Sequence, residues 1–240
     1  MASMHALANP ARFQRFSARA LPWCAGLTAI LLLVGLYMAL VVAPPDYQQK
    51  DTVRIMFVHV PAAWWSMAGY AMLAALGAAL LVWKHPLAAL MARAAAPVGA
   101  AYAATCLITG SFWGRPMWGT WWVWDARLTS MLVLFFLFLG HMALSRAFDS
   151  PERGDKAAAI LALIGVINLP IIKFSVDWWN TLHQPASVVK LDGPAIHSSI
   201  LIPLLVMGVA FLMLFITLVL MRTETEIGRR RLEMAALAAE

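Results

Sequence analysis

The chain has 240 residues, of which 62% are hydrophobic and only 12% are charged. In a soluble domain, about a quarter of the residues are normally charged. This composition therefore excludes an ordinary soluble fold and indicates a membrane protein with several spans. The formal net charge of +6 does not point to a nucleic-acid partner, because Lys and Arg in a membrane protein mark the cytoplasmic loops.

Apolar runs predict six transmembrane helices, since each span needs about 20 residues to cross the hydrocarbon core. In chain order they cover residues 22–43, 62–83, 92–112, 128–146, 156–174 and 197–221. On the third helix, Ala95, Gly99 and Ala103 follow one another at four-residue spacing, which suits close contact with another helix. We therefore predict an all-α polytopic fold that forms one domain over residues 1–240.

The distribution of Lys and Arg predicts the orientation of the chain. The two tails and the turns at 84–93 and 146–156 hold twelve of the eighteen basic residues, which favours the cytoplasm for both termini and for the tail 222–240. The other three loops, about 44–61, 113–127 and 175–196, then face outward. In a bacterial inner membrane this outer face is the periplasmic one.

The outer loop between the third and fourth helices is unusually rich in tryptophan. The stretch "WGRPMWGTWWVWDARLTS" places five of them within twelve positions, namely Trp113, Trp118, Trp121, Trp122 and Trp124. Tryptophan is enriched at membrane interfaces, and its flat, rigid ring also suits a platform for a large planar ligand. The residues of this loop alone leave both interpretations open.

Histidines favour the planar ligand. His59, in "RIMFVHVPAAWW", and His183, in "DWWNTLHQPA", are predicted on either side of the tryptophan loop. A haem iron takes axial imidazoles on its two faces, whereas zinc needs three or four ligands. His197, at the start of the sixth helix, is an alternative ligand, and His141 lies roughly 20 Å along its helix from the tryptophans.

Charged residues near the loop have two interpretations each. Arg54 and Arg127 are the nearest guanidinium groups for the two haem propionates, with Arg115 a third, because arginine binds carboxylates in a bidentate manner. Arg127 is equally suited to an ion pair with Asp125. Asp125 directly precedes the fourth helix, where an N-cap is its preferred role over direct contact with haem.

The motif "WGRPMWGTWWVWDARLT" resembles the tryptophan-rich WWD signature of the haem-handling proteins of cytochrome c maturation. Within that group, residues 20–221 resemble the CcmC family, including the histidine in "HVPAAWW". The resemblance implies that haem b binds transiently and non-covalently at the outer face. It also implies that His59 and His183 are the axial ligands, and that the platform consists of Trp113, Trp118, Trp121, Trp122 and Trp124.

The same resemblance implies the partners. Haem passes to the chaperone CcmE, which bonds a haem vinyl group through a histidine of its own, and the chain associates with the ABC transporter subunits CcmA and CcmB and with the small protein CcmD. The chain has no GxxxxGK loop for ATP and no nucleophile beside a base. The one enzymatic activity compatible with the resemblance is a lyase-like promotion of haem attachment to the chaperone.

Two other functions compete with haem hand-over. A transporter that moves haem or another solute would place ionisable groups near the middle of its spans, but these spans are almost uncharged at their centres. An electron-transfer cytochrome would need a second histidine at the depth of His141, and the sequence offers none. We therefore expect an outer-face haem site.

Overall fold

The computed structural model describes residues 9–184, 187–188 and 192–239. Six of its helical segments are long and apolar enough to span a membrane, which confirms the predicted all-α fold with six spans. Within the described ranges the only bridge outside helices joins Asp46 and Lys50. The elements are α1 (Pro10–Tyr37), a π-helical turn η1 (Met38–Val42), a 3-10 turn η2 (Asp51–Ile55), α2 (Met56–Trp83), α3 (Pro86–Trp118), α4 (Ala126–Leu144), α5 (Pro151–Gly165), α6 (Asn168–Trp178) and α7 (Ser198–Leu237).

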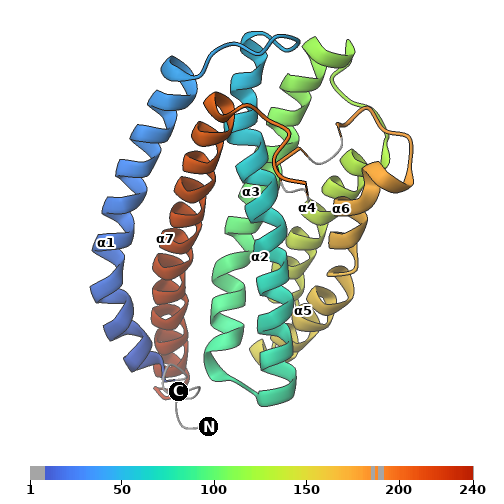
Figure 1. The fold of residues 1–240 in the computed structure, drawn as a ribbon. Helices are drawn as coiled ribbons and strands as arrows, with labels where there is room; N and C mark the ends of the chain where they lie inside the picture. Colours follow the sequence, from blue (N-terminus) through green and yellow to red (C-terminus); the bar gives the residue numbers. More distant parts are fainter. Residues whose placement is uncertain (1–8, 185–186, 189–191, 240) are drawn as a thin grey trace.

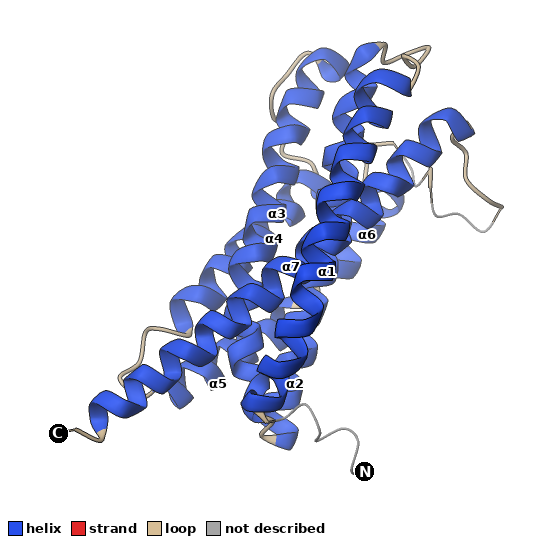
Figure 2. Ribbon diagram, turned by 90° about the vertical axis from the view of Figure 1, so that its left-hand side faces the viewer, coloured by secondary structure: helices blue, strands red, loops and turns tan. Residues whose placement is uncertain are grey.

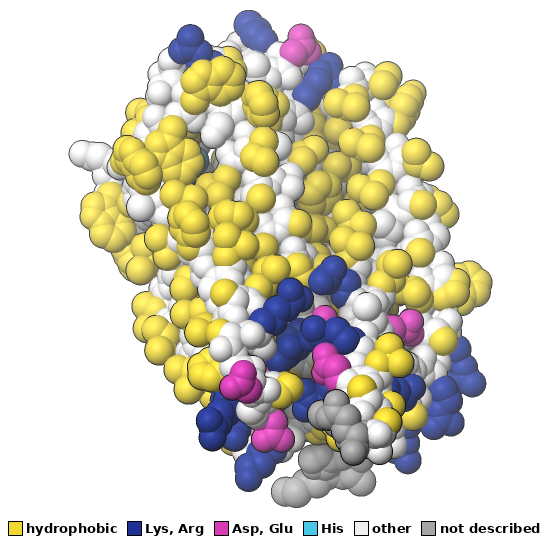
Figure 3. All heavy atoms as spheres, turned by 180° about the vertical axis from the view of Figure 1, so that it is seen from behind, with side chains coloured by type: hydrophobic (Ala, Val, Ile, Leu, Met, Phe, Trp, Pro, Cys, Tyr) yellow, Lys and Arg dark blue, Asp and Glu magenta, His cyan; other side chains and the backbone are white. Residues whose placement is uncertain are grey.

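The helices form an elongated bundle whose two ends differ. In Figure 1, α1 lies beside α7, α2 and α3 are central, and α4, α5 and α6 occupy the opposite side. Both chain ends lie at one end of the bundle, which we call the terminal end, and the loop after α3 lies at the other, the tryptophan end. On the face seen in Figure 3, hydrophobic side chains cover the middle of the bundle, with the larger group of Lys and Arg toward the terminal end and a smaller one at the other end. This is the surface of a multi-pass membrane protein.

Helix boundaries at the tryptophan end correct two of the predicted loops. α3 continues to Trp118, so Trp113 and Trp118 belong to a helix and the connecting segment is 119–125. Gly119, with a φ of +75°, ends α3 in the left-handed conformation that favours glycine. α2 begins at Met56, so His59 lies within its first turn instead of preceding it. Hydropathy marks only the apolar part of a helix, and both helices extend beyond that part.

The fifth predicted span, 156–174, lies within the observed span Pro151–Trp178, which consists of two helical segments. α5 and α6 together form the span, with a break at residues 166–167. Pro170 lacks the N–H that would bond the carbonyl of Val166, and its ring crowds that carbonyl. At the break, Asn168 Nδ2 donates to Ser130 O of α4 at 2.8 Å, which fixes the start of α6.

The first and last helices are longer than their predicted spans. Asn9 is the N-cap of α1 and accepts a hydrogen bond from Ala11 N, so the helix begins at Pro10, twelve residues before the predicted start at 22. α7 runs for 40 residues to Leu237, so the predicted tail 222–240 is helical over most of its length. Figure 2 shows this C-terminal part of α7 projecting past the rest of the bundle.

Small residues bring the central helices into close contact, as their spacing predicts. Ala95 and Ala103 are buried at 1% and 0% exposure, on the same face of α3 as Gly99. A Cβ atom at position 99 would lie 2.3 Å from the ring of Phe138 on α4, and the Cα of Gly99 is 3.8 Å from a Cβ built at Gly69 of α2. Gly99 is therefore the point where three helices meet.

Replacing this glycine tests the packing. We expect Gly99→Ala to destabilise the protein by about 1–3 kcal/mol, because Phe138 must leave its position. Gly26→Ala on α1 is the matched control, since a Cβ atom there has no heavy atom within 4 Å. Thermal melting in mild detergent measures both variants, and equal melting temperatures for the two would contradict the assigned contact.

Candidate functional site

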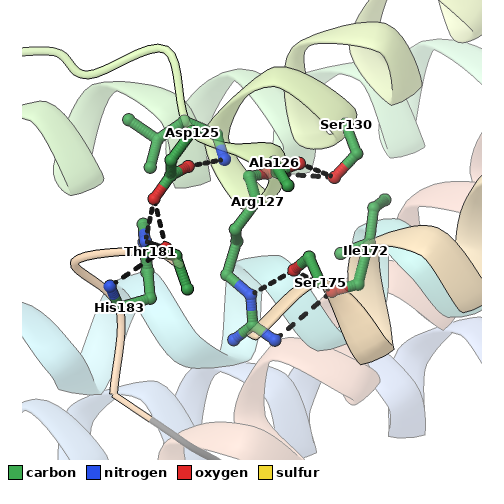
Figure 4. A network of polar contacts seen from close by, with 9 residues as sticks. Asp125, Ala126, Arg127, Ser130, Ile172, Ser175, Thr181 and His183 are labelled. Carbon is green, nitrogen blue, oxygen red and sulfur yellow. Dashed lines mark hydrogen bonds and ion pairs between the residues drawn. The ribbon is translucent and has the colours of Figure 1, made fainter. Parts of the chain in front are cut away.

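A carboxylate joins the start of α4 to the loop that follows α6. Asp125 Oδ1 accepts from the backbone N–H of Leu128 at 2.7 Å, so the predicted N-cap role is confirmed. Asp125 Oδ2 accepts from the Thr181 hydroxyl and faces His183 Nδ1 at 3.2 Å. Figure 4 shows these contacts converging on one carboxylate. The side chain that caps the helix therefore also positions His183.

Burial and hydrogen bonding set the charges of this pair. Burial by itself raises the pKa of Asp125, but bonds from Leu128 N–H and Thr181, together with the facing His183, outweigh it and hold the pKa below its ordinary value. Burial lowers the pKa of His183 more than the neighbouring Asp125 raises it, and Arg127 lowers it further. The pair is thus a carboxylate beside a neutral imidazole at neutral pH.

The tautomer of His183 follows from its partner. A carboxylate only accepts hydrogen bonds, so Nδ1 of the neutral ring carries the proton. Nε2 then holds the lone pair. A histidine that donates one ring N–H to a carboxylate and offers the other nitrogen is the usual arrangement of a metal-ligating histidine.

His59 is oriented by hydroxyl and sulfur groups of α3. Its Nδ1 lies 3.1 Å from Thr109 Oγ1, whose own hydrogen is directed to Thr105 O at 2.6 Å. The hydroxyl therefore accepts from His59, which places the proton on Nδ1 and the lone pair on Nε2. Nε2 makes only a weak contact with Cys106 Sγ, at 4.0 Å. Position 110 must be small, because a Cβ there would lie 2.9 Å from His59 Cε1.

Two tryptophans of α3 contact the two imidazoles edge-on. The Trp113 ring lies 5.5 Å from the His59 ring, centroid to centroid, and Trp118 lies 4.8 Å from His183. Trp113 Nε1 also donates to Gln49 Oε1 at 3.0 Å, which holds the loop before η2 against α3. One helix thus places an indole beside each histidine.

The remaining three tryptophans of the motif lie farther out. Trp121 and Trp124 are 53% and 73% exposed, and Trp122 pairs edge-on with Trp124 at an interplanar angle of 77°. Trp122 Nε1 is buried and has no hydrogen-bond partner among the described residues. The five indoles do not form one flat floor. Trp113 and Trp118 form an inner pair beside the histidines. The other three form an outer group, in which Trp122 Nε1 is a donor without a partner among the described residues.

The arginines predicted near the site have defined partners. Arg54 donates to the carbonyls of Ala39 and Leu40, at 2.9 and 2.6 Å, and contacts Asp51, so it secures the end of η1. Arg115 donates to Gly119 O at the end of α3.

Arg127 differs from them, because its charge acts on His183. It donates to Ser175 Oγ at 3.1 Å and to the carbonyls of Ile172 and Lys173 on α6 (Figure 4). The predicted alternative, an ion pair with Asp125, is not among the ion pairs of the described residues. Arg127 instead connects α4 to α6, and Asp125 connects the start of α4 to the loop after α6.

The other histidines have separate positions. His197 is exposed and caps α7 by accepting from Ser199 N, and His85 precedes α3 at the terminal end. His141 is buried at 2% exposure and lines a cavity with Arg93 and Glu226, residues of the terminal half of the bundle. His5 and part of the loop 175–196 lie outside the described residues.

Sequence reasoning missed the residues that orient the histidines. Thr109 precedes Trp113 by four residues, one helical turn, so helical spacing would have placed both on the face that meets His59. Thr181 lies two residues before His183, a spacing at which hydroxyl side chains commonly bond the backbone. Its hydroxyl indeed accepts from His183 N at 3.2 Å.

Comparison with known proteins agrees with this architecture. Residues 3–238 match the family model CcmC, described as "Heme exporter protein C". Proteins named "Heme exporter protein C" from Bradyrhizobium diazoefficiens and Escherichia coli are 60% and 48% identical to the chain, over 94% and 92% of it and 85% and 89% of their own length. A "Putative cytochrome c biosynthesis ccmC-like mitochondrial protein" of Marchantia polymorpha is 48% identical over 79% of the chain and 80% of its own length. By this near full-length match, the chain belongs to the CcmC family of haem exporter proteins.

Proposed function

We propose that this protein binds haem at the tryptophan end and delivers it for the maturation of c-type cytochromes. The observation that carries the proposal is the arrangement of His59 and His183. Each imidazole has its Nδ1 proton engaged by a fixed acceptor, each retains the Nε2 lone pair, and each lies against a tryptophan of α3. Two such nitrogens supply the axial ligands of a haem iron.

The residues present fit a porphyrin. Indole rings offer a large apolar contact area with little conformational entropy to lose, and the exposed Trp121 and Trp124 lie where a planar ligand can reach them. The buried, unpartnered Trp122 Nε1 supplies a donor for an anionic propionate. Arg127 adds positive charge beside the site, while Arg54 is committed to the end of η1.

Binding requires a local change at His59. Its Nε2 lies 4.0 Å from Cys106 Sγ on α3, and this weak contact must be given up before the lone pair can bind the iron. His183, held by a carboxylate, is the more strongly oriented imidazole. The two ligands therefore differ in mobility, and we expect His59 to be the one that releases the iron when haem leaves.

The proposed route continues outside the chain. The tryptophan end faces the periplasm and the basic terminal end the cytoplasm, in keeping with the distribution of Lys and Arg. Haem held by an open, partly exposed aromatic surface keeps one edge accessible to the chaperone CcmE. The ABC transporter subunits CcmA and CcmB and the small protein CcmD complete the assembly in this proposal.

Passage of haem through the bundle has weaker support. Polar groups between the described helices mostly satisfy one another, as in the Thr28–Thr217 hydroxyl pair at 3.1 Å and the Asn168–Ser130 bond. A pathway for a dianionic solute would need charged or water-lined positions at mid-membrane depth.

Loss of either axial histidine tests the site. We expect His59→Gly and His183→Gly to lose the haem that copurifies with the wild type in mild detergent, and added imidazole to restore its visible spectrum by filling the vacated position. His197→Ser is the control, because serine keeps the cap on α7. Haem that persists in both glycine variants, or that disappears only in His197→Ser, would overturn the assignment.

The orienting residues give a second, spectroscopic test. Asp125→Asn keeps a good N-cap but removes the negative charge that makes His183 a strong donor. We expect haem affinity to fall about tenfold and the reduction potential of the bound haem to rise, since a weaker donor stabilises ferric iron less. Thr109→Val, which removes only a neutral acceptor from His59, should shift the potential less. A potential unchanged in Asp125→Asn would exclude this role for the carboxylate.

A further inference from the structure

A second polar site lies at the terminal end, far from the tryptophans. A cavity of about 10 Å³ opens between α3, α4 and α7. The polar residues that line it are Arg93, His141, Ser145, Arg146, Glu226 and Arg229. None of them belongs to the haem site proposed above.

Two buried nitrogen atoms of this cavity have no hydrogen-bond partner. They are His141 Nδ1, on a residue that is 2% exposed, and Arg229 Nε. A buried polar atom without a partner costs about 1–3 kcal/mol, and native proteins rarely leave two in one place. The arrangement points to a ligand that satisfies both.

The three arginines that line the cavity differ in their partners. Arg93 Nε pairs with Asp155 at 2.6 Å. Arg229 pairs with Glu226 at 2.9 Å, and its Nε also lies 3.8 Å from Glu233 Oε1, an ion-pair distance too long for a hydrogen bond. Arg146 is exposed and forms no ion pair within the described part of the chain. Arg146 is therefore the lining guanidinium whose charge is left to attract an anion.

Size and position restrict the anion further. About 10 Å³ admits roughly one oxygen atom, so the ligand must insert a single oxygen and keep its body outside. Its lining includes the last turn of α4 and the two residues after it, at the end of the bundle where Figure 3 shows Lys and Arg below a hydrophobic band. Phospholipid headgroups occupy this level, and basic pockets between helices bind them.

We propose that this cavity binds a phosphate oxyanion, with a membrane phospholipid as its source. One phosphate oxygen accepts from Arg229 Nε and, in the Nδ1–H tautomer, from His141. The guanidinium of Arg146 covers the phosphate from outside. The lipid then bridges α4 and the C-terminal part of α7, which both line the cavity.

Lipid binding to the purified, delipidated full-length protein tests the proposal. Native mass spectrometry with added phosphatidylglycerol should show one tightly held lipid on the wild type. Arg146→Gln, an exposed position that leaves the fold intact, should weaken that binding about tenfold through loss of a charge-assisted contact. Arg153→Gln is the matched control, because Arg153 is an exposed arginine at the same end and does not line the cavity.

A second arm separates the two sources of phosphate. Inorganic phosphate at millimolar concentration should leave the bound lipid in place if the site is built for a headgroup. Displacement of the lipid by phosphate in the wild type, and not in Arg146→Gln, would support the oxyanion site with free phosphate as its ligand. Equal lipid binding by wild type, Arg146→Gln and Arg153→Gln would overturn the proposal.

Discussion

The carboxylate of Asp125 is the constraint on which the tryptophan end depends. One of its oxygens completes the first turn of α4, and the other holds Thr181 and His183 from the loop after α6. A single buried group thus couples the start of a membrane helix to the position of an imidazole 58 residues later. Because Asp125 both caps α4 and contacts His183, the position of this histidine is coupled to the position of α4 in the bundle.

α3 provides the complementary half of this arrangement. Its last two turns carry Trp113 and Trp118, and the preceding residues include Thr109 and Cys106, so one helix contacts both His59 and His183. The two histidines nevertheless have different environments. A charged acceptor holds one and a neutral hydroxyl holds the other, an asymmetry suited to a site that must both bind a ligand and release it.

Hydropathy and spacing predicted much of this fold. The six spans, the close contact at Gly99 and the cap at Asp125 follow from apolar length, small-residue spacing and the position of an acidic residue before a helix. The extension of α3 through the tryptophans did not, because "GRPMW" contains a glycine and a proline that usually end helices. The break before Asn168 is not predicted either, because a proline such as Pro170 is tolerated within a span whenever neighbours satisfy the backbone.

The site was less accessible to sequence reasoning than the fold. The flanking motifs identify His59 and His183 as a pair, but they do not identify Thr109 and Asp125 as hydrogen-bond partners, which lie 50 and 58 residues away. Arg54 illustrates the opposite case. Its proximity to His59 in sequence suggested a ligand contact, whereas its side chain reaches back to the end of η1. Contacts between distant segments depend on tertiary packing, which a single sequence does not encode locally.

The length of α7 has a mechanical consequence. At 1.5 Å per residue, its 40 residues make a rod of about 60 Å, roughly twice the hydrocarbon thickness. The rod begins after the loop that carries His183, and its C-terminal part projects past the rest of the bundle at the terminal end (Figure 2). Pro203, in its second turn, removes one helical hydrogen bond without ending the helix. One continuous helix therefore connects the loop of His183 to the terminal end of the bundle, so the two ends are joined along the chain as well as by side-chain packing.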